Sequence, residues 1–201
     1  MKRLSDWCGD NFSGGRITEL SVYKGDTYKL ELEGGQTFFI NCAIVADYDL
    51  HEGGEMDAEL LEKLQHADKM RKAKKRALYL LGSRMYSYNE LYKKLLPTYG
   101  EEASRAAADA MQEYGYIDDA DYAGKLAEKL IHGKHYGMSK TRWEMQSRGL
   151  DKNLIEDILA EYTDDEIDEE IMRLLRTKYA EKLSDPDDRP PAVNFPSEWK
   201  L

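Results

Sequence analysis

The spacing of apolar residues changes along this chain, and the change divides it into two kinds of structure. Between residues 16 and 41, apolar side chains recur at every second position, as in Leu20 and Val22 and again in Phe38 and Ile40. Alternation of this kind is typical of strands that bury one face. Beyond residue 57 the apolar residues recur at intervals of three and four, which is the pattern of amphipathic helices. The sequence therefore predicts a mainly α protein with a small β module at its start.

Glycine-containing turns separate the alternating segments. Residues 24–26 (Lys-Gly-Asp) and 34–35 (Gly-Gly) interrupt the alternation, and glycine tolerates the positive φ that tight hairpins require. We therefore predict three antiparallel strands, whose buried face is covered by residues 43–50 and by a helix from Asp57, its N-cap, to His66. The predicted β module spans residues 16–67 and follows a loosely ordered segment, residues 1–15.

Composition limits the size of the cores and the compartment. Of the 201 residues 34% are charged and 41% are hydrophobic, so each helix carries a narrow apolar stripe and we expect an elongated array of small cores. No apolar run is long enough to span a bilayer, and none follows the first residues as in a secretory signal. The two cysteines have neither disulfide nor zinc spacing. We expect a cytoplasmic monomer that makes no membrane contact.

Charge is distributed unevenly along the chain. The net charge of -10 argues against extensive wrapping of nucleic acid, because phosphate binding depends on basic groups. A basic run nevertheless occupies residues 69–76, and residues 156–188 are densely acidic. Salt screens charges beyond about 8 Å, so a basic patch can act locally. The simpler interpretation of each run is a solvated helix face.

Capping signals mark the helices after residue 68. We expect a basic helix from about Asp68 to Ser83. Ser87 and Glu90 then have the spacing of a capping box, in which each side chain bonds to the backbone of the other. Leu91 and Leu95 lie one turn apart in the helix that follows, and the proline at position 97 is expected to end it. Three glycines stand where helices should end in a left-handed C-cap: Gly100, Gly115 and Gly149.

The helices recur in the same order, which predicts tandem three-helix repeats over residues 68–183. Each unit would bury its apolar stripe against its neighbours. The matching positions are Leu91 and Leu95 with Thr141 and Met145; Ala107, Ala110, Met111 and Tyr114 with Ile155, Ile158, Leu159 and Tyr162; and Asp119, Tyr122, Leu126 and Leu130 with Asp164, Ile167, Ile171 and Leu175.

Carboxylates and histidines give no metal site that we can assemble. Asp118 and Asp119 precede a helix and are best interpreted as caps that favour its dipole. His132 and His135 form an H-x-x-H pair without an acidic or cysteine partner at useful spacing. We therefore expect neither a metal nor another cofactor. Four tyrosines at helical spacing are expected in the core or an interface rather than stacked on bases: Tyr86, Tyr88, Tyr92 and Tyr99.

Three stretches of the helical part resemble signatures of the RecX family. The first is ALYLLGSRMYSYNELYKKLLPTYG, and the second is EYGYIDDADYAGKL, in which a Gly-aromatic pair leads to Asp-Asp and an aromatic-Ala pair. The third runs from Gly137 to Gly149 and Leu150, with Thr141 and Met145 where Ile and Leu are usual. The resemblance covers about residues 16–183 and agrees with tandem three-helix repeats.

The C-terminus departs from this family pattern. A helix over residues 165–180 would begin a third repeat, but prolines at positions 186, 190, 191 and 196 exclude its continuation. We therefore expect an incomplete third repeat and an irregular tail, residues 184–201, which suggests truncation or a change of reading frame.

The resemblance implies a non-enzymatic regulator of the RecA recombinase. Such a protein binds the groove of the RecA filament on single-stranded DNA and limits filament growth, recombination and co-protease activity in the SOS response. The sequence contains no nucleophile elbow, Walker or metalloprotease motif. Basic residues at comparable places in the repeats are candidates for contact with the filament, although they could equally serve solubility: Arg84, Lys93, Lys94, Lys134, Lys140, Arg142 and Arg148.

An alternative is a direct DNA-binding regulator of the helix-turn-helix type. Its short helices would bring Arg142 or Arg148 to DNA phosphates. Steeply salt-dependent binding to bare DNA would favour this alternative.

Overall fold

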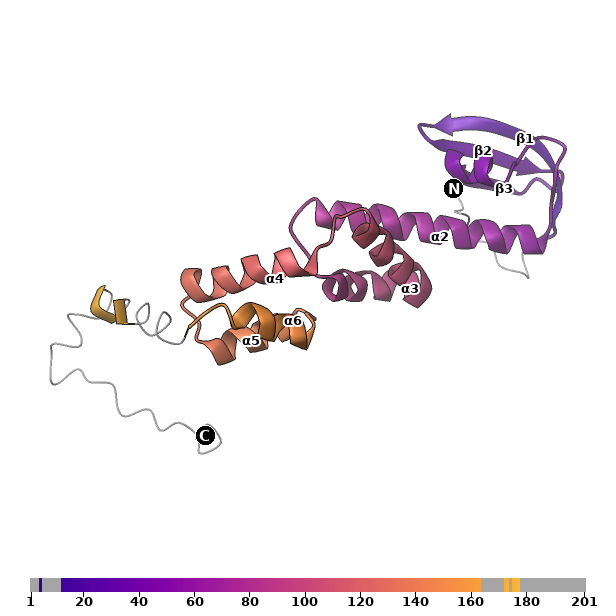
Figure 1. Cartoon of the computed structure of the whole chain (residues 1–201). Helices are drawn as coiled ribbons and strands as arrows, with labels where there is room; N and C mark the ends of the chain where they lie inside the picture. The colour runs from indigo at the N-terminus through magenta and orange to yellow at the C-terminus, as the bar shows by residue number, and fades with distance from the viewer. Residues whose placement is uncertain (1–3, 5–11, 164–171, 174, 178–201) are drawn as a thin grey trace, which may run out of the picture. The chain divides into compact units, whose positions relative to one another are not determined.

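The alternating N-terminal segments form an antiparallel sheet, as predicted (Figure 1). Strands β1 (Gly15–Lys24), β2 (Thr27–Leu32) and β3 (Thr37–Asn41) pair in sequence, and the two-residue strand β4 (Glu55–Met56) joins the far side of β1 to give the order β3-β2-β1-β4. The three predicted strands are confirmed, and β4 was missed because two residues carry no periodic signal.

The computed structural model describes residues 4, 12–163, 172–173 and 175–177. It divides into two compact units, Met1–Asp118 and Asp119–Leu201, hereafter unit 1 and unit 2. Three predicted parts of the chain lie largely outside the described residues. They are most of the N-terminal segment 1–15, most of the third repeat, and all of the tail from residue 184. The domain boundaries drawn from the sequence stay predictions.

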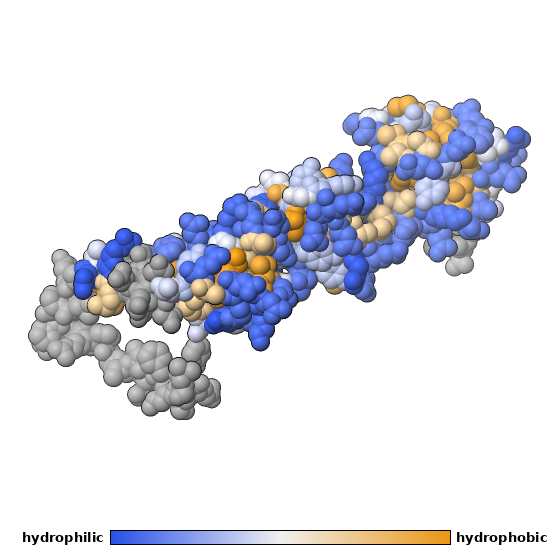
Figure 2. Space-filling view, viewed as in Figure 1, coloured by the Kyte–Doolittle hydropathy of each residue, from blue (hydrophilic) through white to orange (hydrophobic). Residues whose placement is uncertain are grey.

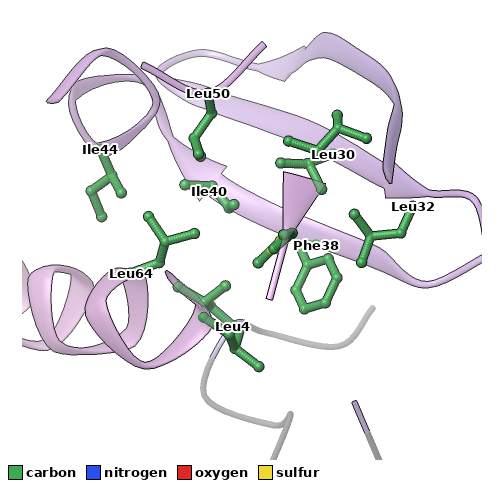
Figure 3. Packing of buried hydrophobic residues seen from close by; sticks show 11 residues of the cluster. Leu4, Leu30, Leu32, Phe38, Ile40, Ile44, Leu50 and Leu64 are labelled. Carbon is green, nitrogen blue, oxygen red and sulfur yellow. The ribbon is translucent and has the colours of Figure 1, made fainter. Parts of the chain in front are cut away.

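One face of the sheet is buried under α1 (Cys42–Asp47) and the first half of α2 (Ala58–Leu81). Figure 3 shows the side chains of the strands and of these helices meeting there, with Leu4 among them. Leu30 and Phe38 lie opposite each other on β2 and β3 and are fully buried. Each such side chain contributes about 1.5–3 kcal/mol when buried, so this small sheet is stabilised from one side.

Helix α2 is continuous where the sequence predicted two helices. Asp57 caps it as predicted, with its Oδ1 accepting a hydrogen bond from Leu60 N at 2.7 Å. The predicted break near residue 67 is wrong, because no glycine or proline interrupts the backbone there. Leu64 in its first half belongs to the sheet core, whereas Ala73 and Ala77 belong to a second core shared with α3.

Helix α3 (Tyr88–Glu113) is bent at Gly100, whose φ of 72° interrupts the helical backbone. The predicted capping box is confirmed: Ser87 Oγ accepts from Glu90 N at 3.1 Å, and Glu90 Oε2 accepts from Ser87 N at 3.4 Å. The prediction that Pro97 ends this helix is wrong, because Pro97 lies within it. The helical dihedral angles are interrupted three residues later, at Gly100. Gly115 and Gly149 also adopt positive φ, as predicted for C-caps.

Residues 119–159 of unit 2 form short helices around their own core. Helix α4 (Asp119–Glu128) continues into the π-helical turn η3 (Lys129–Gly133), followed by α5 (Met138–Ser147) and α6 (Lys152–Leu159). Asp118 directly precedes α4, and Asp119 and Asp121 occupy its first turn, where carboxylates favour the helix dipole. The capping bond expected of Asp118 stays a prediction.

Buried positions of unit 1 recur in unit 2. Leu91 and Leu95 are buried, and so are Thr141 and Met145, which the sequence matched to them. The residue spacing that relates Leu91 to Thr141 also relates the first helix of one repeat to the first helix of the next. This match was not predicted from the sequence. Its members are all buried: Ala73, Ala77 and Leu80 with Ala123, Ala127 and Leu130. This agreement supports the predicted tandem repeat of three helices.

Most of the face seen in Figure 2 is polar, with small apolar patches between the hydrophilic residues. Among the described residues no helix is both long and apolar enough to cross a membrane.

Candidate functional site

Each unit places a cation over a tyrosine ring just before a helix begins. In unit 1 the Arg84 guanidinium carbon lies 3.7 Å from the Tyr86 ring centroid. In unit 2 the Lys134 Nζ lies 5.5 Å from the Tyr136 ring centroid. Both tyrosines directly precede an N-cap residue, which is Ser87 for α3 and Gly137 for α5. Equivalent positions of the two units therefore hold the same kind of pair.

The pair in unit 1 is neutralised within the unit. The Arg84 Nη2 lies 3.4 Å from Glu90 Oε1, and Glu90 is also the acidic member of the capping box. Tyr86 is 8% exposed and belongs to the core of α2 and α3, as do Tyr88 and Tyr99 at its edge. The predicted core position is confirmed for these three tyrosines, whereas Tyr92 is outside this cluster and lies beneath the Arg105 guanidinium, 5.9 Å from it. Arg84 therefore stabilises the start of α3 and offers little unbalanced charge.

The pair in unit 2 gains a second cation instead of a carboxylate. Lys140 occupies the position in α5 that Glu90 occupies in α3, and its Nζ lies 3.7 Å from the Tyr136 ring centroid. Lys134 and Lys140 thus share one ring, and within the described part of the chain neither has a carboxylate at ion-pair distance. We call Lys134, Tyr136 and Lys140 the lysine-tyrosine cluster. Cation-π contacts of about 0.5–1 kcal/mol each at exposed sites help to hold these charges in place.

Trp143 extends this surface along α5. It follows Lys140 by three residues, close to one helical turn, and its side chain is 64% exposed. Trp143 is not among the residues of the unit 2 core, and it leaves a large apolar face exposed for a partner. The cluster and Trp143 together form a cationic and aromatic surface.

Arg142 and Arg148 are engaged inside unit 2. Arg142 donates from Nε and Nη2 to the two carboxylate oxygens of Glu156, at 2.8 and 3.0 Å, and so ties α5 to α6. The hydrogen bonds from Arg142 lower the pKa of Glu156. Arg148 donates to the Tyr122 hydroxyl and to Glu144 Oε1, each at 3.0 Å. Both arginines are half-buried, so they brace the fold, and a role in binding stays a prediction.

The two lysines predicted in unit 1 stand apart from these contacts. Lys93 and Lys94 are exposed on the first half of α3. Of the seven predicted binding residues, the structure brings Lys134 and Lys140 together on one ring. The sequence analysis missed Tyr136 and Trp143. Aligning Arg84 and Tyr86 with Lys134 and Tyr136 at the offset of the repeat would have pointed to the first of them.

The histidines and carboxylates were also compared with the arrangement that a metal ion needs. Among the residues that the structure describes, no three His, Cys, Asp or Glu side chains gather closely enough to hold an ion. His132 instead lies beside Tyr162, with ring centroids 5.9 Å apart.

Comparison with known proteins places the chain among regulatory proteins. No family model matches it. "Regulatory protein RecX" of Leuconostoc citreum is 30% identical over 172 residues, which cover 84% of this chain and 62% of that protein. The protein of the same name from a Clostridium botulinum type B strain is 26% identical, over 86% of this chain and 82% of its own length. The chain thus spans less than two thirds of the Leuconostoc protein.

Solved structures agree with the fold. A crystal structure of regulatory protein RecX matches with a TM-score of 0.68 at 22% identity, covering 85% of each chain. RecX from Lactobacillus salivarius matches with a TM-score of 0.51 at 23% identity, over 57% of this chain and 77% of that one. These two matches concern the fold; the relatives in sequence, together with the three signature stretches, show that the chain belongs to the RecX family of regulatory proteins.

Proposed function

We propose that this chain regulates the RecA recombinase by binding the RecA filament on single-stranded DNA. It limits filament growth, and with it recombination and co-protease activity. Membership in a family of regulatory proteins supports a role in regulation, and the signature stretches over residues 77–150 support RecA as the target. The action requires binding alone, so no catalytic residue is assigned.

The lysine-tyrosine cluster carries the proposal. A filament on DNA presents phosphates and carboxylates, and two cations on one ring provide a compact positive surface for them. The net charge of the chain is -10, so this local charge must act at short range, within the screening length of about 8 Å. Trp143 adds apolar area next to the charge. Charged contacts of this type favour rapid and selective association.

The test is inhibition of RecA in the presence of single-stranded DNA. Increasing amounts of the full chain should lower the ATPase rate and strand exchange of RecA. The double variant Lys134→Glu and Lys140→Glu should need about tenfold more protein for half-inhibition, because reversed charges repel the filament at each contact. The matched control reverses two other exposed lysines of unit 2, Lys129→Glu and Lys152→Glu, and should inhibit normally.

Two outcomes contradict the proposal. If the unmodified chain leaves RecA activity unchanged at saturating concentration, RecA is not its target. If the cluster variant folds and inhibits as well as the control, the binding surface lies elsewhere. Circular dichroism establishes that both variants retain their helices.

A further inference from the structure

One side of α2 carries the sheet along its first half and lies open along its second half (Figure 1). Leu64 points into the sheet core from this side. At about 100° per residue, the same side continues through Arg71, Lys75 and Leu78, beyond the end of that core. The second half packs against α3 through another side, which carries Ala77. Part of α2 therefore presents one of its sides to solvent.

The open side combines positive charge with apolar area. Leu78 is 46% exposed, and its neighbour Tyr79 is 70% exposed. Lys75 is exposed one turn before Tyr79, and Arg71 is half-buried two turns before Leu78. Gly82, one turn after Leu78, is the exposed C-cap residue of the helix. We call these five residues the basic-apolar face.

The cations of this face are not neutralised by their neighbours. Lys72 is paired with Asp68, one turn before it. Within the described part of the chain, Arg71 and Lys75 have no carboxylate at ion-pair distance. The other basic residues of the run 69–76 add to the positive field around them. A partner for this face must therefore bring negative charge.

A hollow lies at the sheet end of the basic-apolar face. It has a volume of about 400 Å³, with Arg71 and Lys75 on its α2 side and Asp26, Thr27 and Asn41 on its sheet side. An acidic side chain of a partner can enter here between the two cations and the polar groups of the sheet. The hollow lies wholly within unit 1 and shares no residue with the lysine-tyrosine cluster.

The spacing of the face suits a helix as its partner. Arg71, Lys75, Leu78 and Gly82 follow one another at intervals of four, three and four residues, so they form one stripe along α2. An amphipathic helix that lies along such a stripe sets its own apolar residues against it. Because Gly82 has no side chain, the two backbones can approach closely at that end.

We infer that the basic-apolar face binds an acidic amphipathic helix of a partner protein, with apolar residues of the partner on Leu78 and its carboxylates beside Arg71 and Lys75. A nucleic acid backbone would satisfy the cations but leave Leu78 in water. One face of the Tyr79 ring also carries the Arg76 guanidinium, whose carbon lies 5.1 Å from the ring centroid. Charge complementarity together with the aliphatic surface therefore favours a peptide. The site goes beyond the proposed regulation of RecA, since it uses no residue of the lysine-tyrosine cluster.

The test is fluorescence anisotropy of a labelled helical peptide with the full chain and no other protein. The peptide has about three heptads, with leucines on one face and glutamates on both flanks. Arg71→Glu with Lys75→Glu should weaken binding about tenfold or more, because the reversed charges repel the glutamates. Leu78→Ala should weaken it about fivefold, because it removes apolar contact area at an exposed position.

Two control variants match these changes elsewhere on the surface. Lys129→Glu with Lys152→Glu has the same charge change, and Leu96→Ala removes a leucine that is 37% exposed on α3. Each should bind the peptide within about twofold of the unmodified chain. If circular dichroism shows that the double variant at Arg71 and Lys75 has lost its helices, Lys75→Gln takes its place and should weaken binding about threefold.

Changes of ligand separate the classes of partner. A peptide with lysine in place of every glutamate should bind about tenfold more weakly or worse, and an oligothymidine should displace the labelled peptide about tenfold less effectively than unlabelled peptide. Equal displacement by oligothymidine would make the face a nucleic acid site and overturn the inference. Equal binding of the lysine peptide, equal weakening by the control variants, or no binding at low salt would overturn it as well. Because RecA is absent from the assay, such a failure leaves the proposed regulation standing.

Discussion

Leu95 tests the core of the first helical repeat most directly. Its side chain is 1% exposed among the residues that α2 and the two halves of α3 bury together. Truncating such a leucine costs about 2–5 kcal/mol, and Leu95→Asp adds the cost of placing a carboxylate among apolar side chains, which is several kcal/mol more. The sum matches the whole stability of a domain, about 5–15 kcal/mol. We therefore expect Leu95→Asp to unfold this core.

The neighbouring position supplies the control. Leu96 follows on the same helix and is 37% exposed, so Leu96→Asp should change the free energy of unfolding by less than about 1 kcal/mol. Urea denaturation followed by circular dichroism compares the two, and Leu95→Ala gives a measurable intermediate loss if the aspartate variant has no folded baseline. Equal midpoints for Leu95→Asp and the unmodified chain would show that this face of α3 is not buried.

Two further predictions concern unit 1. The hydrogen bond from Ser21, followed by that from Lys29, lowers the pKa of Glu19 from 4.5 to about 2; the ionised form thus stabilises the sheet above pH 4.5, and this contribution should disappear as the pH falls towards 2. Carboxyl NMR titration of Glu19 checks this, and a midpoint near 4.5 would mean that the Ser21 and Lys29 contacts are not formed in solution. A chain that begins at Asp68 should remain helical by circular dichroism, because it keeps the buried residues of the second core from Ala73 onward. Loss of the helical signal would show that the sheet and the helical core fold only together.

Local signals predicted much of this fold. The alternation in the strands, the caps Asp57 and Ser87 and the left-handed glycine Gly149 depend on neighbouring residues, and each was predicted correctly. The continuity of α2 was not predicted, and the reason is physical. Its two halves bury opposite faces, so the apolar pattern shifts phase near residue 68 although the backbone does not break.

The candidate site depends on longer-range contacts and was less predictable. Formal charge made Arg142 and Arg148 look available for binding, but their partners, Glu156 and Tyr122, lie on other helices. Conversely, Lys134 and Lys140 meet on one ring because the loop before α5 turns the chain back, with His135 at a φ of 55°. Sequence spacing alone gives neither outcome.

Because α2 is one unbroken helix, the angle between its two buried faces is fixed by the number of residues between them. This angle limits which changes in the length of α2 the fold can accept. Each inserted residue rotates the rest of a helix by about 100°. One residue added between Leu64 and Ala73 would therefore turn Ala73 and Ala77 away from α3, or Leu61 and Leu64 away from the sheet. Seven residues, close to two full turns, would nearly restore the phase. Length variation in this segment is thus tolerated in steps of whole turns, and the helix acts as a spacer whose rotation, as well as its length, is held by the two cores.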